Sequence, residues 1–298
     1  MKIFFICIFL FMLAHSQTVA KDEIIIKAAH YPEGLLWDGR TNALYYAEMP
    51  RDRIMRYKNN EKSVFFWNEG CGPTSIAPVG VQWAITCHIG RSLIIADHQG
   101  RLVEEIKFDN RGELLQNPND IVGFRGGVYL TDSGRFEADA PASGSIYYWH
   151  PGYGMQHIIG DLHYANGVTI DGSSQTLFVS EHLGRRILAF PIRGKGKLGS
   201  PRTFADIATK LALFEPLTGP DGLEFGPDGR LYAAIYGAGR IMVFEAVGTY
   251  LHSLPRSETY LTTISFLSAE NALFAAGAFD NRKFPYTGNI TRINLSAD

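Results

Sequence analysis

Residues 219–244 read GPDGLEFGPDGRLYAAIYGAGRIMVF and contain the repeat unit that decides the fold. Asp221 is followed by Leu223, then by a Gly-Pro-Asp-Gly turn, and then by two apolar runs, Leu231–Ala233 and Ile241–Phe244. Asp-Gly accepts the positive φ angles of a tight hairpin turn. The segment is therefore predicted to form three consecutive antiparallel strands.

The same pattern occurs six times along the chain. Each unit begins with a residue that is followed two positions later by an aliphatic side chain, and these first residues are Glu33, Thr74, Asn119, Asn166, Asp221 and Thr262. Repeats of about 40 to 50 residues that hold several short strands are typical of β-propeller blades. The sequence predicts an all-β fold, one six-bladed β-propeller of four-stranded antiparallel blades over residues 21–298. The stretch Glu23–Lys27 is expected to close the ring as the outer strand of the last blade.

The six first residues are expected to surround one mouth of the central tunnel. Because blade strands are antiparallel, the ends of the second strands lie on the same face, at Glu48, Cys87, His88, Asp132, Glu181, His182 and Tyr236. Two long loops, 133–144 and 278–288, and an apolar excursion at 210–219 are expected to wall a pocket above that mouth, since binding residues concentrate on loops over a rigid scaffold. Ordinary surface variation is the alternative reading of these insertions.

Four of the six first residues are oxygen donors: Glu33, Asn119, Asn166 and Asp221. Carboxylates and carboxamides without sulfur or imidazole suit a hard cation, and Ca²⁺ takes six to eight oxygens. The ring is therefore predicted to bind one divalent cation at the tunnel, Ca²⁺ before Zn²⁺, Mn²⁺ or Mg²⁺. A turn role is the alternative, but Gly-Pro-Asp-Gly occurs twice and only Asp221, not Asp228, falls in the ring register. Glu224 is expected to form an inter-blade salt bridge rather than a second ion site.

The first twenty residues differ from the rest of the chain. Lys2 precedes the apolar run Ile3–Leu13, and small residues follow at Thr18 and Ala20, which predicts a cleaved signal peptide over residues 1–20. The protein is then expected to be exported, periplasmic or secreted, with no membrane association after cleavage; a short membrane anchor is the alternative. The formal net charge of −2 and the absence of a Lys/Arg block argue against nucleic acid as a partner.

In an exported chain only two cysteines would remain, Cys71 and Cys87, and an oxidising compartment makes a disulfide between them plausible, with two free thiols as the alternative. His88 and His182 are interpreted as hydrogen-bonded residues rather than catalytic ones. Asn289-Ile290-Thr291 is a glycosylation sequon that has meaning only in a eukaryotic secretory pathway.

Several motifs together resemble one known family. They are Pro32-Glu33-Gly34 with Trp37, Asn117-Pro118-Asn119-Asp120 with Tyr129-Leu130-Thr131-Asp132, Ala165-Asn166-Gly167, and Gly219-Pro220-Asp221-Gly222. The chain resembles the six-bladed propellers of the senescence marker protein, gluconolactonase and luciferin-regenerating enzyme family, to which regucalcin is related. The resemblance implies a cation bound through Glu33, Asn166 and Asp221, with Asn119 as a fourth ligand or a substrate contact.

The same resemblance implies hydrolysis of a small lactone or related ester, in which the cation polarises the carbonyl and Asp221 activates water. Asn117, Asn119, Asp132, Glu181 and Tyr236 are the expected substrate contacts. Asn117 stands where sugar-lactone hydrolases of the family often carry arginine, so recognition of a sugar lactone is not implied. Two alternatives remain open: a phosphotriesterase, in which Asp221 is the nucleophile, and a non-catalytic calcium-binding propeller that binds a partner. The default expectation is a monomer acting on a small molecule.

Overall fold

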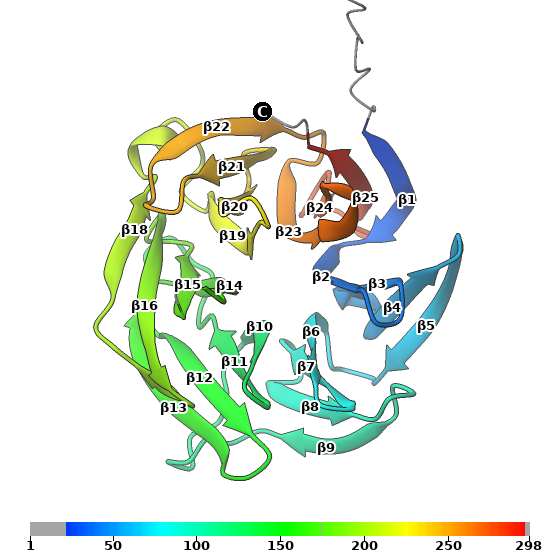
Figure 1. Cartoon of the computed structure of the whole chain (residues 1–298), viewed down its shortest axis with the longest axis vertical. Helices are drawn as coiled ribbons and strands as arrows, with labels where there is room; N and C mark the ends of the chain where they lie inside the picture. Colours follow the sequence, from blue (N-terminus) through cyan, green and yellow to red (C-terminus); the bar gives the residue numbers. More distant parts are fainter. Residues whose placement is uncertain (1–21, 174, 296–298) are drawn as a thin grey trace, which may run out of the picture.

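The computed structural model describes residues 22–173 and 175–295, and the predicted signal peptide, residues 1–20, lies outside them. The described strands form five antiparallel sheets around a central axis (Figure 1). The eight-stranded sheet consists of two blades joined at the single pair of Tyr236 with Tyr260, so the arrangement corresponds to the six predicted blades. Within those two ranges, no helix is long and apolar enough to cross a membrane.

The first three blades each have four strands, given from the tunnel outward. Blade one contains β2 (Pro32–Asp38), β3 (Ala43–Glu48), β4 (Arg53–Lys58) and β5 (Glu61–Trp67). Blade two contains β6 (Pro73–Val79), β7 (Gln82–Cys87), β8 (Ser92–Ala96) and β9 (Leu102–Ile106). Blade three contains β10 (Pro118–Phe124), β11 (Gly127–Asp132), β12 (Gly144–His150) and β13 (Gly154–Leu162).

The last three blades follow the same plan. Blade four contains β14 (Ala165–Asp171), β15 (Thr176–Glu181), β16 (Arg186–Gly194) and the two outer strands β17 (Lys197–Leu198) and β18 (Arg202–Asp206). Blade five contains β19 (Gly219–Phe225), β20 (Leu231–Tyr236), β21 (Arg240–Phe244) and β22 (Tyr250–Pro255). Blade six contains β23 (Tyr260–Leu267), β24 (Ala272–Ala278), β25 (Thr287–Asn294) and, outermost, β1 (Glu23–His30).

In the described parts of the chain, three short 3₁₀ helices lie in connections: η1 (Met49–Arg51), η2 (Thr209–Leu211) and η3 (Ser268–Glu270). The ring is closed by β1, which pairs antiparallel with β25 from Glu23 opposite Arg292 to His30 opposite Thr287 (Figure 1). The predicted outer strand at Glu23–Lys27 is therefore confirmed. Because the first and last strands share a blade, the described ring has no open seam between blades one and six.

The hydrophobic core is divided among the blade interfaces. Each of six clusters of buried side chains combines residues of two neighbouring blades, for example Ile54 and Phe66 of blade one with Ile85 and Ile94 of blade two. A single blade therefore cannot bury its faces alone, and each blade packs against its two neighbours. Such a core gives a rigid frame for the inner strands at the tunnel.

Candidate metal and substrate site

The innermost strand of every blade changes pairing register at its tunnel end. The shifts occur between Glu33 and Leu36, Pro73 and Ser75, Pro118 and Ile121, Ala165 and Val168, Pro220 and Leu223, and Leu261 and Thr263. Each of the six predicted first residues lies at or within one of these bulges. A β-bulge re-aims a side chain and ends regular pairing. The bulges therefore turn these residues from the blade toward the tunnel.

A glycine after three of the ring residues lets the next blade approach closely. A Cβ added to Gly34 would stand 2.2 Å from the Thr74 carbonyl oxygen, and one added to Gly167 would stand 2.1 Å from the Asp221 carbonyl oxygen. A Cβ on Gly222 would lie 2.7 Å from the Thr262 carbonyl oxygen. The Glu-Gly, Asn-Gly and Asp-Gly pairs of the sequence thus set the spacing between adjacent ring positions.

Buried hydroxyl groups hold three of the four candidate ligands by their backbone. They stand one residue before the end of the second strand and donate to the carbonyl of the next blade's ring residue: Thr86 to Asn119 at 2.6 Å, Thr131 to Asn166 at 2.5 Å and Ser180 to Asp221 at 2.6 Å. All three are fully buried. These hydroxyls were not predicted from the sequence, although a hydroxyl at this position in blades two, three and four is a recognisable pattern.

The Asn166 side chain is oriented with its oxygen unpaired. The Asn166 amide nitrogen lies 3.2 Å from His182 Nδ1, and His182 Nε2 lies 3.0 Å from the Leu217 carbonyl oxygen. A carbonyl can only accept, so Nε2 carries the proton and Nδ1 accepts from Asn166. Burial lowers the pKa of His182 to about 4, which keeps the ring neutral. Asn166 Oδ1 is buried without a hydrogen-bond partner among the described residues.

Burial and neighbouring carboxylates disfavour the charged form of both ring carboxylates. Burial first, and then the charges of Asp221 and Asp120, raise the pKa of Glu33 well above its usual value. Burial and Asp120 raise the pKa of Asp221 in the same way, opposed by a hydrogen bond from Asn166. Asp120 itself is tied to three blades, because it accepts from Ser75 Oγ and from the Val168 amide, each at 2.8 Å. Such a pair of carboxylates needs a counter-charge to be ionised together.

The four candidate ligands fit a hard cation. Asn119 donates its amide to Ser133 Oγ at 2.9 Å, which fixes its orientation, and Glu33, Asn119, Asn166 and Asp221 all line one cavity. Together they supply two carboxylates and two carboxamides, one with an unpaired buried oxygen. No group of three or more His, Cys, Asp or Glu side chains with metal-binding geometry occurs in the described residues. The carboxamides therefore have to complete any such site.

The cavity above the ring has a volume of about 520 Å³ and mostly aromatic walls. Its ring-bearing side chains are Tyr31, His88, Phe136, Tyr164, His182, Tyr236 and Tyr286. Phe136 packs against Tyr164 and His182, with ring centroids 4.8 and 5.3 Å away. Glu33 and Asp221 are the only acidic side chains among the lining residues, and Lys and Arg are absent from that lining. The wall is thus apolar and the floor is acidic.

Three of the aromatic residues have backbones in the left-handed region, Tyr31 at φ 46°, Tyr164 at φ 62° and Tyr286 at φ 54°. Bulky residues rarely adopt such angles, and backbone strain concentrates at functional sites. Tyr31 and Tyr164 each stand two positions before a ring residue. Neither tyrosine was predicted from the sequence as a cavity residue, although this shared offset from Glu33 and Asn166 could have revealed both.

The structure brings only some of the predicted substrate contacts into the cavity. Asn119 and Tyr236 line it, whereas Asn117 lies in a separate surface depression. Asp132 accepts hydrogen bonds from the backbone amides of Gln116 and Asn117, each at 2.7 Å. The expectation that Asn117 and Asp132 reach a bound substrate is not supported by these positions.

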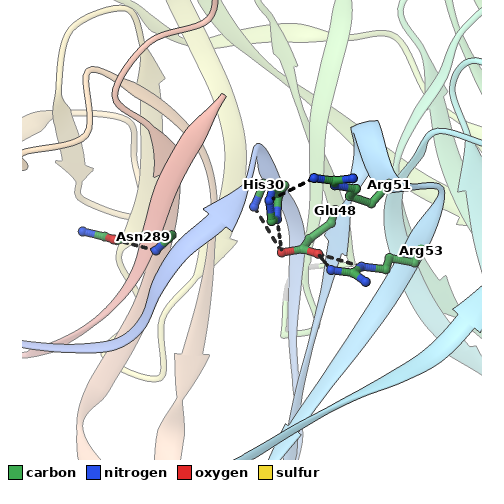
Figure 2. A network of polar contacts seen from close by, with 6 residues as sticks. His30, Glu48, Arg51, Arg53 and Asn289 are labelled. Carbon is green, nitrogen blue, oxygen red and sulfur yellow. Dashed lines mark hydrogen bonds and ion pairs between the residues drawn. The ribbon is translucent and has the colours of Figure 1, made fainter. Parts of the chain in front are cut away.

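Glu181 and Glu48 are also directed away from the cavity. Glu181 accepts from the His163 amide at 2.9 Å and pairs with Arg186. Figure 2 shows Glu48 between His30 and Arg53, where it accepts from the His30 amide at 3.1 Å and from Arg53 Nε at 2.7 Å. Both carboxylates thus bind a backbone amide just before the first strand of their own blade. Glu181 is therefore not among the residues that line the cavity.

The two long loops wall the cavity, but the third excursion does not. Loop 133–144 contributes Phe136, and loop 278–288 contributes Asn281 and Tyr286. Segment 210–219 supplies no lining residue, because Leu211 is buried in the core between blades four and five. Its contribution is indirect, since the Leu217 carbonyl holds His182.

The opposite end of the tunnel has a second cavity, of about 570 Å³, that includes Glu224 and Asp120. The predicted inter-blade salt bridge of Glu224 is absent from the described residues, because no basic side chain lines this cavity. Burial, and then the charge of Asp120, raises the pKa of Glu224 to about 8. Because Glu224 lines this second cavity, it lies away from the ring mouth. Its raised pKa favours the protonated form at neutral pH.

Two further expectations are resolved by the structure. Cys71 and Cys87 form a disulfide at the tunnel face of blade two. Asn289, the sequon residue, is 9% exposed within β25, and its Oδ1 accepts from the Ala28 amide at 3.4 Å (Figure 2). In the folded protein this side chain is therefore nearly buried and contacts the strand that closes the ring.

The fold and the ring define a six-bladed β-propeller with an oxygen-donor site under an aromatic cavity. Residues 31–276 match the family model described as the SMP-30/Gluconolactonase/LRE-like region. The chain belongs to this family, as its motifs predict.

Individual relatives are distant. The chain is 26% identical over 224 residues to the lactonase drp35 of Staphylococcus haemolyticus, covering 72% of this chain and 66% of the relative. It thus spans about two thirds of the length of that relative. Among solved structures, a gluconolactonase from Xanthomonas campestris superposes with a TM-score of 0.75 at 23% identity, covering 92% of this chain and 89% of the other. A calcium-binding regucalcin from Agrobacterium tumefaciens gives 0.76 at 16% identity, covering 92% and 94%.

Proposed function

We propose that the protein is a metal-dependent hydrolase of small lactones or related esters. The observation that carries the proposal is the ring itself, in which two buried carboxylates with raised pKa values line one cavity with the unpaired Oδ1 of Asn166. The family membership and the lactonase and gluconolactonase relatives support the reaction class.

Glu33, Asn119, Asn166 and Asp221 would hold one divalent cation, for which Ca²⁺ is the best match to an all-oxygen donor set. When bound, the cation would polarise the ester carbonyl and stabilise negative charge on its oxygen. Its positive charge would also allow both carboxylates to ionise, which is unfavourable for two nearby buried carboxylates without a counter-charge. The regucalcin relative, described as calcium-binding, supports this assignment.

The chain's own residues supply the rest of the reaction. Asp221, fixed at its backbone by Ser180, would accept a proton from the attacking water. His182 holds Asn166 in the orientation that keeps its oxygen toward the site. A substrate held against the aromatic wall would displace water from the floor, which would strengthen electrostatic interactions there. With no Lys or Arg in the lining, a neutral substrate is favoured over an anionic one.

The first experiment is a hydrolysis assay with lactones, aryl esters and phosphotriesters, before and after exhaustive chelation. Lactone or aryl-ester turnover is expected, with loss on chelation and recovery on adding Ca²⁺. Asp221→Asn is expected to lower kcat by about 100-fold or more, because it removes the base. Phosphotriester turnover without lactone turnover would favour the phosphotriesterase alternative. Undiminished activity in the metal-free protein would contradict the mechanism.

The chain offers a matched control in its second Gly-Pro-Asp-Gly motif. Asp228 occupies the same tetrapeptide but lies in the hairpin turn, where its carboxylate accepts from the Arg230 amide and from the Tyr232 hydroxyl. Asp228→Asn should therefore leave cation binding and kcat unchanged. Equal losses in the two variants would show that the effect of Asp221→Asn is not specific to the ring.

We also propose that the protein acts outside the cytoplasm, as the predicted signal peptide implies. The disulfide between Cys71 and Cys87 supports this placement, because disulfides persist in oxidising compartments. Fractionation of cells that express the full chain, with mass spectrometry of the mature N-terminus, tests it. Recovery of the intact leader on protein in the cytoplasm would contradict it.

A further inference from the structure

We propose that the Tyr236 hydroxyl is a catalytic hydrogen-bond donor that contacts the leaving oxygen of the substrate's ester group, and that Asn281 and Tyr31 fix its direction. This inference rests on the hydrolase activity proposed above and names a residue that acts in it. It is carried by the hydrogen bonds that converge on one phenol oxygen.

Tyr236 receives two hydrogen bonds. Asn281 Nδ2 donates to the Tyr236 hydroxyl oxygen at 2.7 Å, and the Tyr31 hydroxyl donates to the same oxygen at 3.2 Å. A hydroxyl oxygen has two acceptor positions and one proton. Both acceptor positions are filled, so the proton must point away from Asn281 and Tyr31. Tyr236 donates to no residue among those that the structure describes, and its side chain lines the cavity.

The Tyr236 ring is held in place by its neighbours. Its centroid lies 5.0 Å from that of Tyr260, 5.7 Å from that of His182 and 5.9 Å from that of Phe136. The side chain is only 6% exposed. The hydroxyl is therefore fixed before a substrate arrives, and preorganised donors stabilise developing charge without reorganisation at the moment of reaction.

The three hydroxyl and amide groups come from different blades. Tyr236 ends β20 of blade five, Asn281 lies in the long loop of blade six, and Tyr31 precedes β2 of blade one. Tyr236, Glu33 and Asp221 line the same cavity, so the hydroxyl shares that space with the acidic floor. Burial, together with the charges of Asp221 and Glu33, raises the pKa of Tyr236 to about 12, so the proton is retained at neutral pH.

A donor at this position has a specific chemical use. The carbonyl oxygen of the substrate would face the ring, where a bound cation would stabilise it, and Asp221 would take a proton from the attacking water. As the carbon–oxygen bond breaks, the remaining ester oxygen would take its electron pair and develop negative charge. The proton held by Asp221 would then pass to that oxygen, which gives the alcohol and the acid and regenerates Asp221. An alkoxide is a poor leaving group, so a hydrogen bond to it matters most for lactones and alkyl esters. A phenolate leaving group needs much less help.

The test compares one alkyl lactone, δ-valerolactone, with one activated ester, p-nitrophenyl acetate, at saturating Ca²⁺. Tyr236→Phe is expected to lower kcat/KM for δ-valerolactone by about 100-fold, the usual effect of removing one such donor. For p-nitrophenyl acetate the loss should stay below about threefold, within the range of a weak neutral hydrogen bond. Tyr260→Phe is the matched control, since it removes a hydroxyl from the adjacent ring outside the cavity lining, and it should leave both values unchanged.

A second variant tests the direction of the Tyr236 hydroxyl proton rather than the presence of the hydroxyl. Asn281→Asp replaces a donor with a group that can only accept, so it would take the Tyr236 proton away from the substrate. It is expected to reproduce the selective loss of Tyr236→Phe although Tyr236 remains. Asn281→Ala removes the donor without offering an acceptor and should cost about tenfold or less on the lactone. Calorimetric titration with Ca²⁺ and circular dichroism are measured for every variant.

The outcomes separate this inference from the function on which it rests. Selective loss on the lactone in both Tyr236→Phe and Asn281→Asp supports it. Equal losses on the two substrates, or wild-type selectivity in Asn281→Asp, would overturn it and leave the hydrolase function standing. If the wild-type protein turns over neither substrate nor any other lactone or ester, the proposed function fails and this inference fails with it. If Tyr236→Phe does not fold, Asn281→Asp decides alone.

Discussion

Gly167 is where the geometry of the ring is most sensitive to one added atom. A Cβ at this residue would lie 2.1 Å from the Asp221 carbonyl oxygen and 2.8 Å from the Gly222 Cα, both in backbone of the next blade. The φ of Gly167 lies outside the left-handed region, so a positive φ does not penalise alanine there. Gly167→Ala therefore tests chiefly the contact between two blades.

The size of the effect follows from the distance. Carbon and carbonyl oxygen approach each other to roughly 3.3 Å, so Asp221 and the strand that carries it must move by roughly 1 Å. Overpacking of this kind costs about 1–3 kcal/mol of stability. Misplacement by 1 Å at a reacting group costs about 100-fold in rate, and disturbance of the residues that support a metal ligand costs about 10–100-fold in affinity.

The assay is calorimetric titration of the metal-free protein with Ca²⁺, combined with thermal unfolding and the kcat/KM of the lactone substrate. Gly194→Ala is the control, because a Cβ at Gly194 meets no atom within 4 Å and its φ is equally ordinary. Gly167→Ala should lose Ca²⁺ affinity and kcat/KM, while Gly194→Ala should keep both. Ca²⁺ affinity within about twofold of wild type in Gly167→Ala, at an unchanged melting temperature, would refute the spacing argument.

Three further predictions concern the supports of the site. Ser180→Ala leaves the buried Asp221 carbonyl without its 2.6 Å hydrogen bond. The unfolding free energy should therefore fall by about 1–3 kcal/mol in denaturant titrations, and Ca²⁺ binding should weaken. Full retention of stability and Ca²⁺ affinity would show that the hydroxyl is dispensable. Cys71→Ser with Cys87→Ser should cost about 3 kcal/mol of unfolding free energy and leave Ca²⁺ affinity unchanged, and a loss of Ca²⁺ binding instead would contradict a purely stabilising disulfide. Phe136→Ala enlarges the cavity, so KM should rise for small lactones and fall for bulkier ones while Ca²⁺ affinity stays constant. An equal change in KM for small and bulky lactones would argue against a role of Phe136 in substrate fit.

The strand framework and the six ring positions could be predicted from the sequence because both follow from local rules. Alternating apolar runs and Asp-Gly turns fix where strands begin and end, and a repeated unit fixes which positions are equivalent. Glu33, Asn119, Asn166 and Asp221 consequently line the cavity as predicted from the repeat.

The ends of the second strands show where this reasoning stops. Successive side chains of a strand point to opposite faces, so an error of one residue reverses the direction. Thr131 and Ser180 face the next blade's ring residue, while Asp132 and Glu181, one position later, bind the preceding backbone. The sequence could predict that the ends of the second strands lie on the ring face. The direction of each side chain there depends on the pairing register of the two strands, which the sequence does not specify.

The cavity wall was less predictable still. Phe136, Asn281 and Tyr286 lie in long connections that have no periodicity, and the conformations of these connections depend on contacts between blades rather than on local propensity. The sequence could identify loops 133–144 and 278–288 as wall segments, but not the side chains that enter the cavity. The excursion at 210–219 was predicted to be a wall because it is apolar, yet Leu211 faces the core.

These two levels of predictability correspond to two physical parts of the site. The floor depends on backbone features of the blades, namely a bulge at each ring position, Gly167 and its counterparts, and the hydroxyls that hold the ring carbonyls. The wall depends on side chains that loops present, such as Phe136 and the Asn281 that orients Tyr236. A loop residue can change without moving a bulge, so substitutions in the wall should alter the choice of substrate at constant cation affinity. Substitutions in the floor should alter cation affinity first and activity with every substrate in proportion.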